Sequence, residues 1–334
     1  MASVPLSIFL TGATGFIGGT ILDCLSKTHP DYHIKVLIRR PEDAEKLQSI
    51  YRDLEPIIGD LSSLDLLKET AATVDFVIFA AKENATAVHA LINGLATQHS
   101  ASPPEPRLIS ISGTRSLIDL SAPVTGTADG SKRPWSDIQD IKKILSLPKE
   151  RFHAGADQSI IAHGVAKGVG SMLVSPGQLW GRGKGQIKTE GAAAAAYYSA
   201  VKDRGRAFIV GDGSVAWSWV SIGDLGRAVV LLMDQATSGD IAIRNRVGVN
   251  EQGYYFVQAE QVTMRERADA IRERLHLDKV ETVSVETVAA IHSFGTIMWG
   301  CGATFQADRL RTLGWRPKEF DWRALMEEEP GERA

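Results

Sequence analysis

Cysteine is nearly absent from this chain, which has only Cys24 and Cys301 among its 334 residues. Two thiols can form neither a disulfide framework nor a thiolate zinc site, so we expect no metal and a reducing, cytoplasmic environment. No apolar run approaches the roughly 20 residues that a membrane-spanning helix needs. Residues 4–10 are apolar but follow no basic segment and lead directly into glycines, which indicates a strand and not a secretion signal.

An excess of charge of either sign is also missing, since 40 acidic and 37 basic residues leave a net charge of -3. Such a chain offers no electrostatic reason to bind nucleic acid or an anionic membrane. We therefore expect a small-molecule substrate as the partner, and a monomer or homodimer. The length fits one large α/β domain with an additional lobe, or two domains of moderate size.

In the first half of the chain, short apolar runs alternate with segments whose apolar residues recur at helical spacing. This alternation predicts an α/β fold of the Rossmann type, a doubly wound parallel sheet with helices on both faces. The predicted strands cover residues 7–10, 33–38, 56–60, 75–81, 107–112 and 171–174, and the predicted helices cover 16–26, 41–50, 64–70, 88–98 and 148–167.

Beyond residue 178 the regular alternation is lost, and glycines at every second position indicate a loop over residues 178–185. We assign residues 1–178 to a cofactor-binding domain, to which residues 215–245 return. Residues 179–214 and 246–330 are assigned to a smaller α+β substrate lobe.

The segment between the first strand and the first helix, Thr11-Gly-Ala-Thr-Gly-Phe-Ile-Gly18, has an informative glycine spacing. Gly12 permits a backbone geometry closed to other residues, Gly15 allows a pyrophosphate to approach, and Gly18 lets the helix and strand pack closely. The phosphates then lie on free N–H groups at the positive end of the helix. The alternative is a glycine-tolerant turn without a ligand. We expect a nicotinamide dinucleotide to bind through Gly12, Thr14, Gly15, Phe16, Ile17 and Gly18.

The end of the second strand bears on the choice of cofactor, because Arg39 and Arg40 stand where an acidic residue would bind the ribose of NAD(H). Two guanidinium groups suit a 2′-phosphate, which favours NADP(H) over NAD(H), unless these arginines only face solvent. Asp60 and Leu61 follow the third strand, where the adenine ring would rest. Further expected cofactor contacts at the ends of later strands are Ala80, Ala81, Lys82, Ser112 and Pro176.

The glycine turn is one of several motifs that occur in a characteristic order. Together they resemble the extended and atypical short-chain dehydrogenases/reductases, which include the NAD-dependent epimerase/dehydratase-like and NmrA-like groups. The resemblance implies a nicotinamide-dependent enzyme or, as in some NmrA-like proteins, a cofactor-sensing regulator. The other motifs are Gly59-Asp60-Leu61, Ser175-Pro176 with residues 179–183, the segment 220–225, and Leu313-Gly-Trp-Arg-Pro317.

The chain departs from that superfamily at its catalytic pair. Redox members use Tyr-x-x-x-Lys, in which the lysine lowers the pKa of the proton-donating tyrosine. The expected window, residues 149–154, contains no tyrosine. A literal match occurs later, at Tyr198 and Lys202, but in the predicted substrate lobe, so we interpret it as coincidence.

Other side chains are candidates for the chemistry. The resemblance places Ser112 and Thr114 near the hydroxyl that polarises a substrate carbonyl, although Ser112–Thr114 could be only a turn. His153 lies in the window without a tyrosine and could donate a proton, although a lone histidine is more often structural. Asp157, on the same helix, resembles an acidic position in related proteins.

Three functions remain open. The first is an NADP(H)-dependent oxidoreductase acting on a small organic molecule, possibly a secondary metabolite, without the tyrosine-lysine pair. The second is an NADP(H)-binding isomerase or cyclase without net redox chemistry. The third is an NmrA-like regulator that senses the cofactor. We favour the first, because a long C-terminal lobe suits a substrate site better than a sensor.

Overall fold

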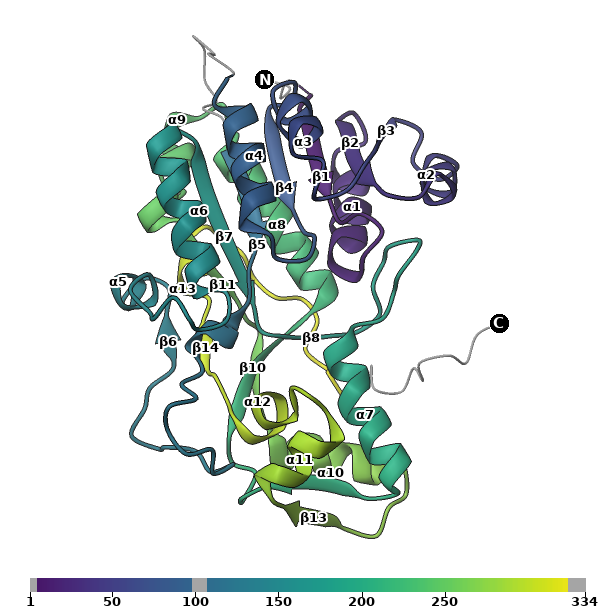
Figure 1. The fold of residues 1–334 in the computed structure, drawn as a ribbon, viewed down its shortest axis with the longest axis vertical. Helices are drawn as coiled ribbons and strands as arrows, with labels where there is room; N and C mark the ends of the chain where they lie inside the picture. The colour runs from purple at the N-terminus through teal and green to yellow at the C-terminus, as the bar shows by residue number, and fades with distance from the viewer. Residues whose placement is uncertain (1–4, 98–106, 324–334) are drawn as a thin grey trace.

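The structure, a computed structural model, describes residues 5–97 and 107–323. Within these ranges, seven parallel strands form the central sheet in the order β11-β7-β5-β4-β1-β2-β3 (Figure 1). Nearly continuous apolar runs form these strands because both faces of the sheet are covered. The strands are β1 (Ser7–Thr11), β2 (His33–Ile38), β3 (Leu54–Ile58), β4 (Phe76–Phe79), β5 (Arg107–Ile111), β7 (Gly170–Pro176) and β11 (Tyr254–Val257).

Helices cover both faces of this sheet, which confirms the predicted doubly wound fold. On one face α3 (Leu64–Ala71) contacts α4 (Ala85–Leu95), and α4 contacts α6 (Ala154–Lys167). On the other face α1 (Phe16–Thr28) contacts α8 (Ile222–Ala236). The short helix α2 (Pro41–Gln48) packs against β2 and β3.

A second group of elements lies beyond the end of the sheet toward which β7 runs, in the lower half of Figure 1. Strand β10 (Ala216–Ser221) pairs with β8 (Gln178–Trp180) and with β12 (Glu260–Thr263), while β9 (Ala207–Val210) pairs with β13 (Val280–Val283). Helices α7 (Ala192–Arg204), α10 (Met264–Arg274), α11 (Val285–Ile291) and α12 (Gly295–Gly300) accompany these strands. The shorter elements of the chain are η1 (Thr114–Leu117), β6 (Trp135–Ser136), α5 (Ile141–Ile144), α9 (Ile241–Arg244), η2 (Asn250–Gln252), β14 (Phe305–Gln306) and α13 (Asp308–Thr312).

The second group has a hydrophobic core of its own. Tyr197, Phe208 and Trp299 are buried in it, and their rings pack edge to face or tilted against one another. Tyr198 is part of the same cluster, with a relative exposure of 9%. The Tyr198–Lys202 match therefore lies on α7, in a different core from the one beneath the main sheet.

Three predictions about elements need correction or addition. The helix predicted over residues 148–167 begins only at Ala154, because His153 has a positive φ of 67° that a continuing helix cannot contain. The predicted loop 178–185 begins with strand β8. Strand β11, in the segment assigned to the substrate lobe, joins the main sheet beside β7 and was not predicted.

Two further observations concern the limits of the predicted elements. The predicted helix 88–98 corresponds to α4, which begins earlier, at Ala85, and ends earlier, at Leu95; Gln98 itself lies outside the described residues. Among the helices in the described part of the chain, none is both long and apolar enough to cross a membrane.

Candidate cofactor and catalytic site

The glycine-rich turn leaves the N-terminus of α1 open to an anion. Gly15 is the N-cap residue, and it offers no side chain to cap the helix, nor does the first turn contain an acidic residue. The N–H groups of Phe16, Ile17 and Gly18 have no acceptor within the helix, and the helix dipole makes this end positive. These donors therefore fit the pyrophosphate of a dinucleotide.

The glycines of this turn have different structural roles. A Cβ on Gly12, which has a φ of +79°, would lie 2.4 Å from the carbonyl oxygen of Ala80 at the end of β4. A Cβ on Gly18 would lie 2.2 Å from the carbonyl oxygen of Gly12. A Cβ on Gly15 would meet only the Gly12 oxygen, at 3.2 Å. Gly12 and Gly18 are thus required by the packing of the turn, whereas Gly15 has an open side.

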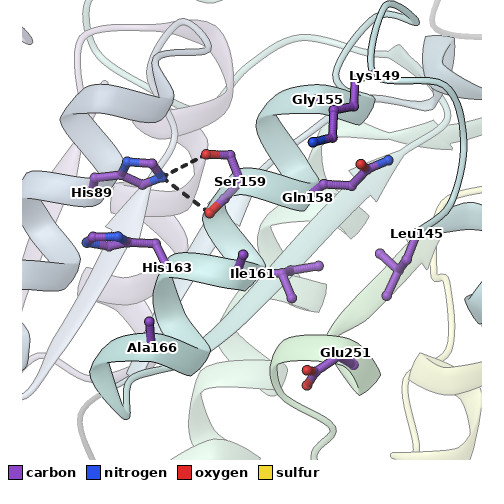
Figure 2. A pocket seen from close by; sticks show the side chains of 11 residues that line it. His89, Leu145, Lys149, Gly155, Gln158, Ser159, Ile161, His163, Ala166 and Glu251 are labelled. Carbon is purple, nitrogen blue, oxygen red and sulfur yellow. Dashed lines mark hydrogen bonds between the residues drawn. The ribbon is translucent and has the colours of Figure 1, made fainter.

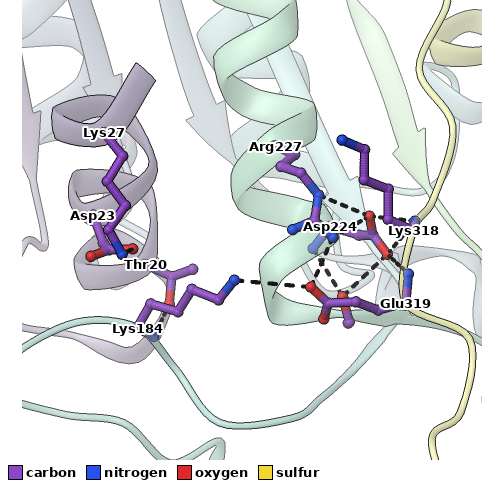
Figure 3. Close-up of polar contacts among 9 residues, drawn as sticks. Thr20, Asp23, Lys27, Lys184, Asp224, Arg227, Lys318 and Glu319 are labelled. Carbon is purple, nitrogen blue, oxygen red and sulfur yellow. Dashed lines mark hydrogen bonds and ion pairs between the residues drawn. The ribbon is translucent and has the colours of Figure 1, made fainter. Parts of the chain in front are cut away.

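The segment 181–191 lies across the start of α1. The backbone N–H of Lys184 donates a hydrogen bond to Thr20 Oγ1 over 3.0 Å (Figure 3). Gly183 and Gly191 both lie against the ring of Phe16, where a Cβ would come within 3.0 Å of ring carbons. The ring at the first position of α1 is therefore held by this segment.

A buried carboxylate fixes the C-terminal segment to the same region (Figure 3). Asp224, at the start of α8, is fully buried and accepts hydrogen bonds from the backbone N–H groups of Lys318 and Glu319. Arg227 donates to Asp224 over 2.7 Å and to Glu319 over 2.8 Å, and Glu319 lies 4.0 Å from the ammonium group of Lys184. The network connects α8, the C-terminal segment and the segment over α1.

The two arginines after β2 differ in their contacts. Arg40 donates to both carboxylate oxygens of Asp43, over 2.8 and 2.9 Å, as the residue preceding α2. Arg39 is exposed and has no hydrogen-bond or ion-pair partner among the described residues. Arg39 is thus the guanidinium that is available for an incoming phosphate.

The other expected cofactor residues lie at the ends of β3 and β4. Asp60 accepts hydrogen bonds from Ser62 and Ser63, which lower the pKa of its carboxyl group. It therefore shapes the turn that precedes α3. Leu61, Ala80 and Ala81 are partly exposed and Lys82 is exposed, so all four side chains remain accessible at this edge.

His153 is held in an unusual backbone conformation immediately before α6. Its positive φ is uncommon for a residue with a side chain and costs about 1–3 kcal/mol. Its Nδ1 is hydrogen-bonded to the carboxylate of Glu83, in the connection between β4 and α4. Its Nε2 lies so close to Gly113 that a Cβ there would be 2.6 Å away. The imidazole is thereby fixed between the ends of β4 and β5.

Two effects oppose each other at this imidazole. Burial lowers the pKa of His153, while the hydrogen bond and the charge of Glu83 raise the pKa in part. Among the described residues, Nε2 has no hydrogen-bond partner. His153 therefore presents one oriented nitrogen that can give or take a proton.

Ser112 lies at the centre of a buried polar cluster. Its hydroxyl is 2.8 Å from Oδ2 of Asp157, one turn into α6. Burial raises the pKa of Asp157 to about 8. From the other side, Ser175 donates to the hydroxyl of Tyr254 over 2.8 Å, and hydrogen bonding also links Tyr254 to Ser112. Burial therefore favours the protonated form of Asp157, next to the hydroxyl of Ser112, a catalytic candidate from the sequence.

Thr114 has a different environment from Ser112. It is buried, and its hydroxyl donates to the carbonyl oxygen of Pro176 over 3.3 Å. This bond joins the ends of β5 and β7. The structure thus brings together Ser112, Thr114, His153 and Pro176 at the carboxyl edge of the sheet, where open α/β sheets bind their ligands.

Sequence reasoning missed Glu83 and Tyr254 and did not connect Asp157 to His153. One signal was available, because His153 and Asp157 are four residues apart, the spacing of the expected Tyr-x-x-x-Lys pair. No comparable signal marked Glu83 or Tyr254, since they come from distant segments.

A pocket of about 730 Å³ lies on the opposite side of α6 and contains none of the proposed catalytic residues (Figure 2). Within it the rings of His89 and His163 stack at 4.3 Å, and His89 also contacts Ser159. His163 is hydrogen-bonded to Asn93 over 2.9 Å. These contacts fasten α6 to α4 and so fix the position of the residues at the start of α6.

Comparison with known proteins agrees with the nucleotide-binding geometry of the glycine turn. Residues 12–130 match a family model described as NAD(P)H-binding. The chain therefore carries an NAD(P)H-binding domain over these residues. The matched residues include the glycines of the turn and the strands β2 to β5.

Two similar proteins match this chain over nearly its whole length. The oxidase ucsJ of an Acremonium species is 29% identical over 93% of this chain and 92% of its own. The uncharacterized protein C2A9.02 of Schizosaccharomyces pombe is 25% identical over 93% and 95%.

Solved structures show the same fold at lower identity. UDP-glucuronic acid 4-epimerase from Bacillus cereus, with NAD, has a TM-score of 0.64 at 14% identity, covering 96% of both chains. The dTDP-glucose 4,6-dehydratase from Bacillus anthracis, with NAD, has a TM-score of 0.63 at 15% identity, covering 96% of this chain and 94% of its own.

Proposed function

We propose that this protein is an NADP(H)-dependent oxidoreductase that reduces a carbonyl group of a small organic substrate, with His153 in place of the missing tyrosine. The observation that carries the proposal is the His153–Glu83 pair, fixed against Gly113 at the carboxyl edge of the sheet. A related protein named as an oxidase supports redox chemistry.

NADPH, when bound, supplies a hydride for the carbonyl carbon of the substrate. The proton that the carbonyl oxygen then needs comes from Nε2 of His153, and carbonyl, hydride and proton together give the alcohol. Glu83 orients the ring through Nδ1 and stabilises the charged imidazolium.

The protonation state of Asp157 determines the direction in which the Ser112 hydroxyl donates its hydrogen bond. A protonated Asp157 donates to Ser112, and the Ser112 proton is then free to polarise the substrate carbonyl. An ionised Asp157 would accept that proton and leave Ser112 without a donor. Thr114 acts as a positioning residue, because its own proton is engaged by Pro176.

Two features support NADP(H) over NAD(H). Arg39 is exposed at the end of β2 without a partner among the described residues, where it can bind the 2′-phosphate. In addition, positions 39 and 40 are both arginine, so neither provides the carboxylate that would bind the ribose of NAD(H). Residues 179–214 and much of the segment 246–323 then form the substrate lobe.

The test offers the full chain a panel of ketones and enals as substrates and measures the oxidation of NADPH by the absorbance of the nicotinamide. We expect His153→Gln to lower kcat about 100-fold or more with NADPH binding intact. Tyr198→Phe is the matched control and should leave the rate unchanged. NADPH binding without any turnover across the panel would refute the reductase and favour the non-redox enzyme or the sensor.

A further inference from the structure

Arg115 is a half-buried cation beside the proposed catalytic site. It belongs to η1, directly after β5, two residues beyond the glycine that packs against His153. Its guanidinium carbon lies 4.9 Å from the ring centre of Phe152 and 5.2 Å from that of Phe294. Phe152 precedes His153 in the chain, and Phe294 precedes α12. Three separate segments thus meet around one positive charge.

This guanidinium has no hydrogen-bond or ion-pair partner among the residues that the structure describes. Glu83, the acidic residue whose charge acts on it, has its close contact with His153. The neighbouring Arg151 is already paired with Asp119 over 2.6 Å. A guanidinium carries five N–H donors, so Arg115 retains its hydrogen-bonding capacity for another molecule.

Arg204 and Arg309, two other arginines that lie over aromatic rings, differ from Arg115 in their polar contacts. Arg204 lies over Phe208 and also pairs with Glu281, while Arg309 lies over Tyr255 and donates to the carbonyl oxygen of Asp137. In those cases the ring contact accompanies a structural hydrogen bond or ion pair. Arg115 has the ring contacts, but no acceptor among the described residues binds its guanidinium.

Both rings that contact Arg115 are accessible to solvent. Phe152 and Phe294 each have a relative exposure of 38%. The guanidinium carbon lies over both rings, and the N–H groups of the planar guanidinium form a fork that matches a carboxylate. The exposed rings add an apolar surface next to that fork.

We propose that Arg115, Phe152 and Phe294 bind the carboxylate and the adjoining apolar part of the substrate, so that the substrate is an organic acid. The proposal rests on the function proposed above, because it treats the neighbourhood of His153 as the substrate site. Arg115 would then determine specificity, holding the acid group while a carbonyl elsewhere in the molecule faces His153.

Carboxylate binding should also change the pKa of His153. The charge of Arg115 contributes to lowering the pKa of His153. A bound carboxylate neutralises that charge, and the pKa of His153 then rises. A purely structural Arg115 would not produce this response.

The experiment uses benzoate and its neutral analogue benzamide as probes of the full chain loaded with NADPH, with binding measured by calorimetry. We expect benzoate to bind at least 10-fold more tightly than benzamide. Arg115→Met keeps the apolar stem over the rings and should abolish this difference, while Arg115→Lys should retain part of it. Arg52→Met, at an exposed arginine in the connection between α2 and the edge strand β3, is the control and should leave both affinities unchanged.

The outcomes separate this proposal from the proposed function. Equal binding of benzoate and benzamide by the unaltered protein, or an unchanged benzoate preference in Arg115→Met, overturns the carboxylate site. A 10-fold loss of NADPH affinity in Arg115→Met overturns it too, because the arginine would then serve the cofactor. Benzoate selectivity that depends on Arg115, without any NADPH oxidation by carbonyl acids, upholds the acid site and refutes only the reductase.

Discussion

Nδ1 of His153 is hydrogen-bonded to the carboxylate of Glu83, which lies 70 residues earlier in the chain. The pair unites the end of β4 with the start of α6. In the proposed mechanism it takes the place of the tyrosine-lysine pair, and the carboxylate of Glu83 orients the imidazole.

The first prediction concerns the pH dependence of this pair. Glu83 raises the pKa of His153 against the effect of burial, so Glu83→Gln should lower that pKa further. The acid form of His153 is lost as pH rises through its pKa. The decline of kcat/KM with increasing pH should therefore occur at lower pH in the variant. Glu69→Gln, on the exposed side of α3, is the control, and an unshifted profile in Glu83→Gln would contradict the assignment.

The second prediction separates the two arginines after β2. Arg39→Ala should weaken NADPH binding about 10-fold or more, because it removes a charge-assisted hydrogen bond to the 2′-phosphate. Binding of NADH should change little. Arg40→Ala should have a smaller effect on NADPH, since Asp43 already holds that guanidinium. Titration of protein fluorescence with each cofactor measures this, and equal losses for NADPH and NADH would refute the phosphate role of Arg39.

The third prediction concerns the buried carboxyl of Asp157. Its pKa of about 8 in the folded chain exceeds the ordinary value of 3.8, so the folded chain binds this proton more tightly than the unfolded chain. The associated stability is greatest below about pH 4 and is lost as pH rises towards 8. Asp157→Asn removes this dependence.

Urea unfolding at several pH values provides the measurement for Asp157. The free energy of unfolding of Asp157→Asn, relative to the unaltered protein, should increase steadily from pH 5 to pH 8. A constant difference across that range would show that Asp157 does not retain its proton in the folded chain.

The fourth prediction concerns the Asp224 network. Asp224→Asn removes the charge that faces Arg227 and one acceptor for the backbone of Lys318 and Glu319. We expect the free energy of unfolding to fall by about 1–3 kcal/mol, because the backbone N–H groups that face this buried site lose an acceptor, whereas Arg227 keeps its pair with Glu319. Glu45→Gln, on the exposed side of α2, should change it by less than about 0.5 kcal/mol. A loss for Asp224→Asn no larger than that of the control would show that the network contributes little.

Most of the main sheet could be predicted because the apolar pattern of each strand and helix is visible within a few residues. Strand β11 could not, since four residues far from the other strands carry little periodic signal. The start of α6 was also misplaced, because the positive φ of His153 is imposed by contacts with Glu83 and Gly113 and not by local propensity.

The amino-acid sequence by itself determined the Rossmann-type order of elements, the glycine turn at the start of α1 and the arginines after β2. These features depend on local spacing, which a linear chain displays directly. Only the tertiary structure decided which side chains meet at the carboxyl edge. Ser112 reaches Asp157 across 45 positions, His153 reaches Glu83 across 70, and Ser175 reaches Tyr254 across 79. Such contacts depend on the order of strands in the sheet, which local spacing does not contain.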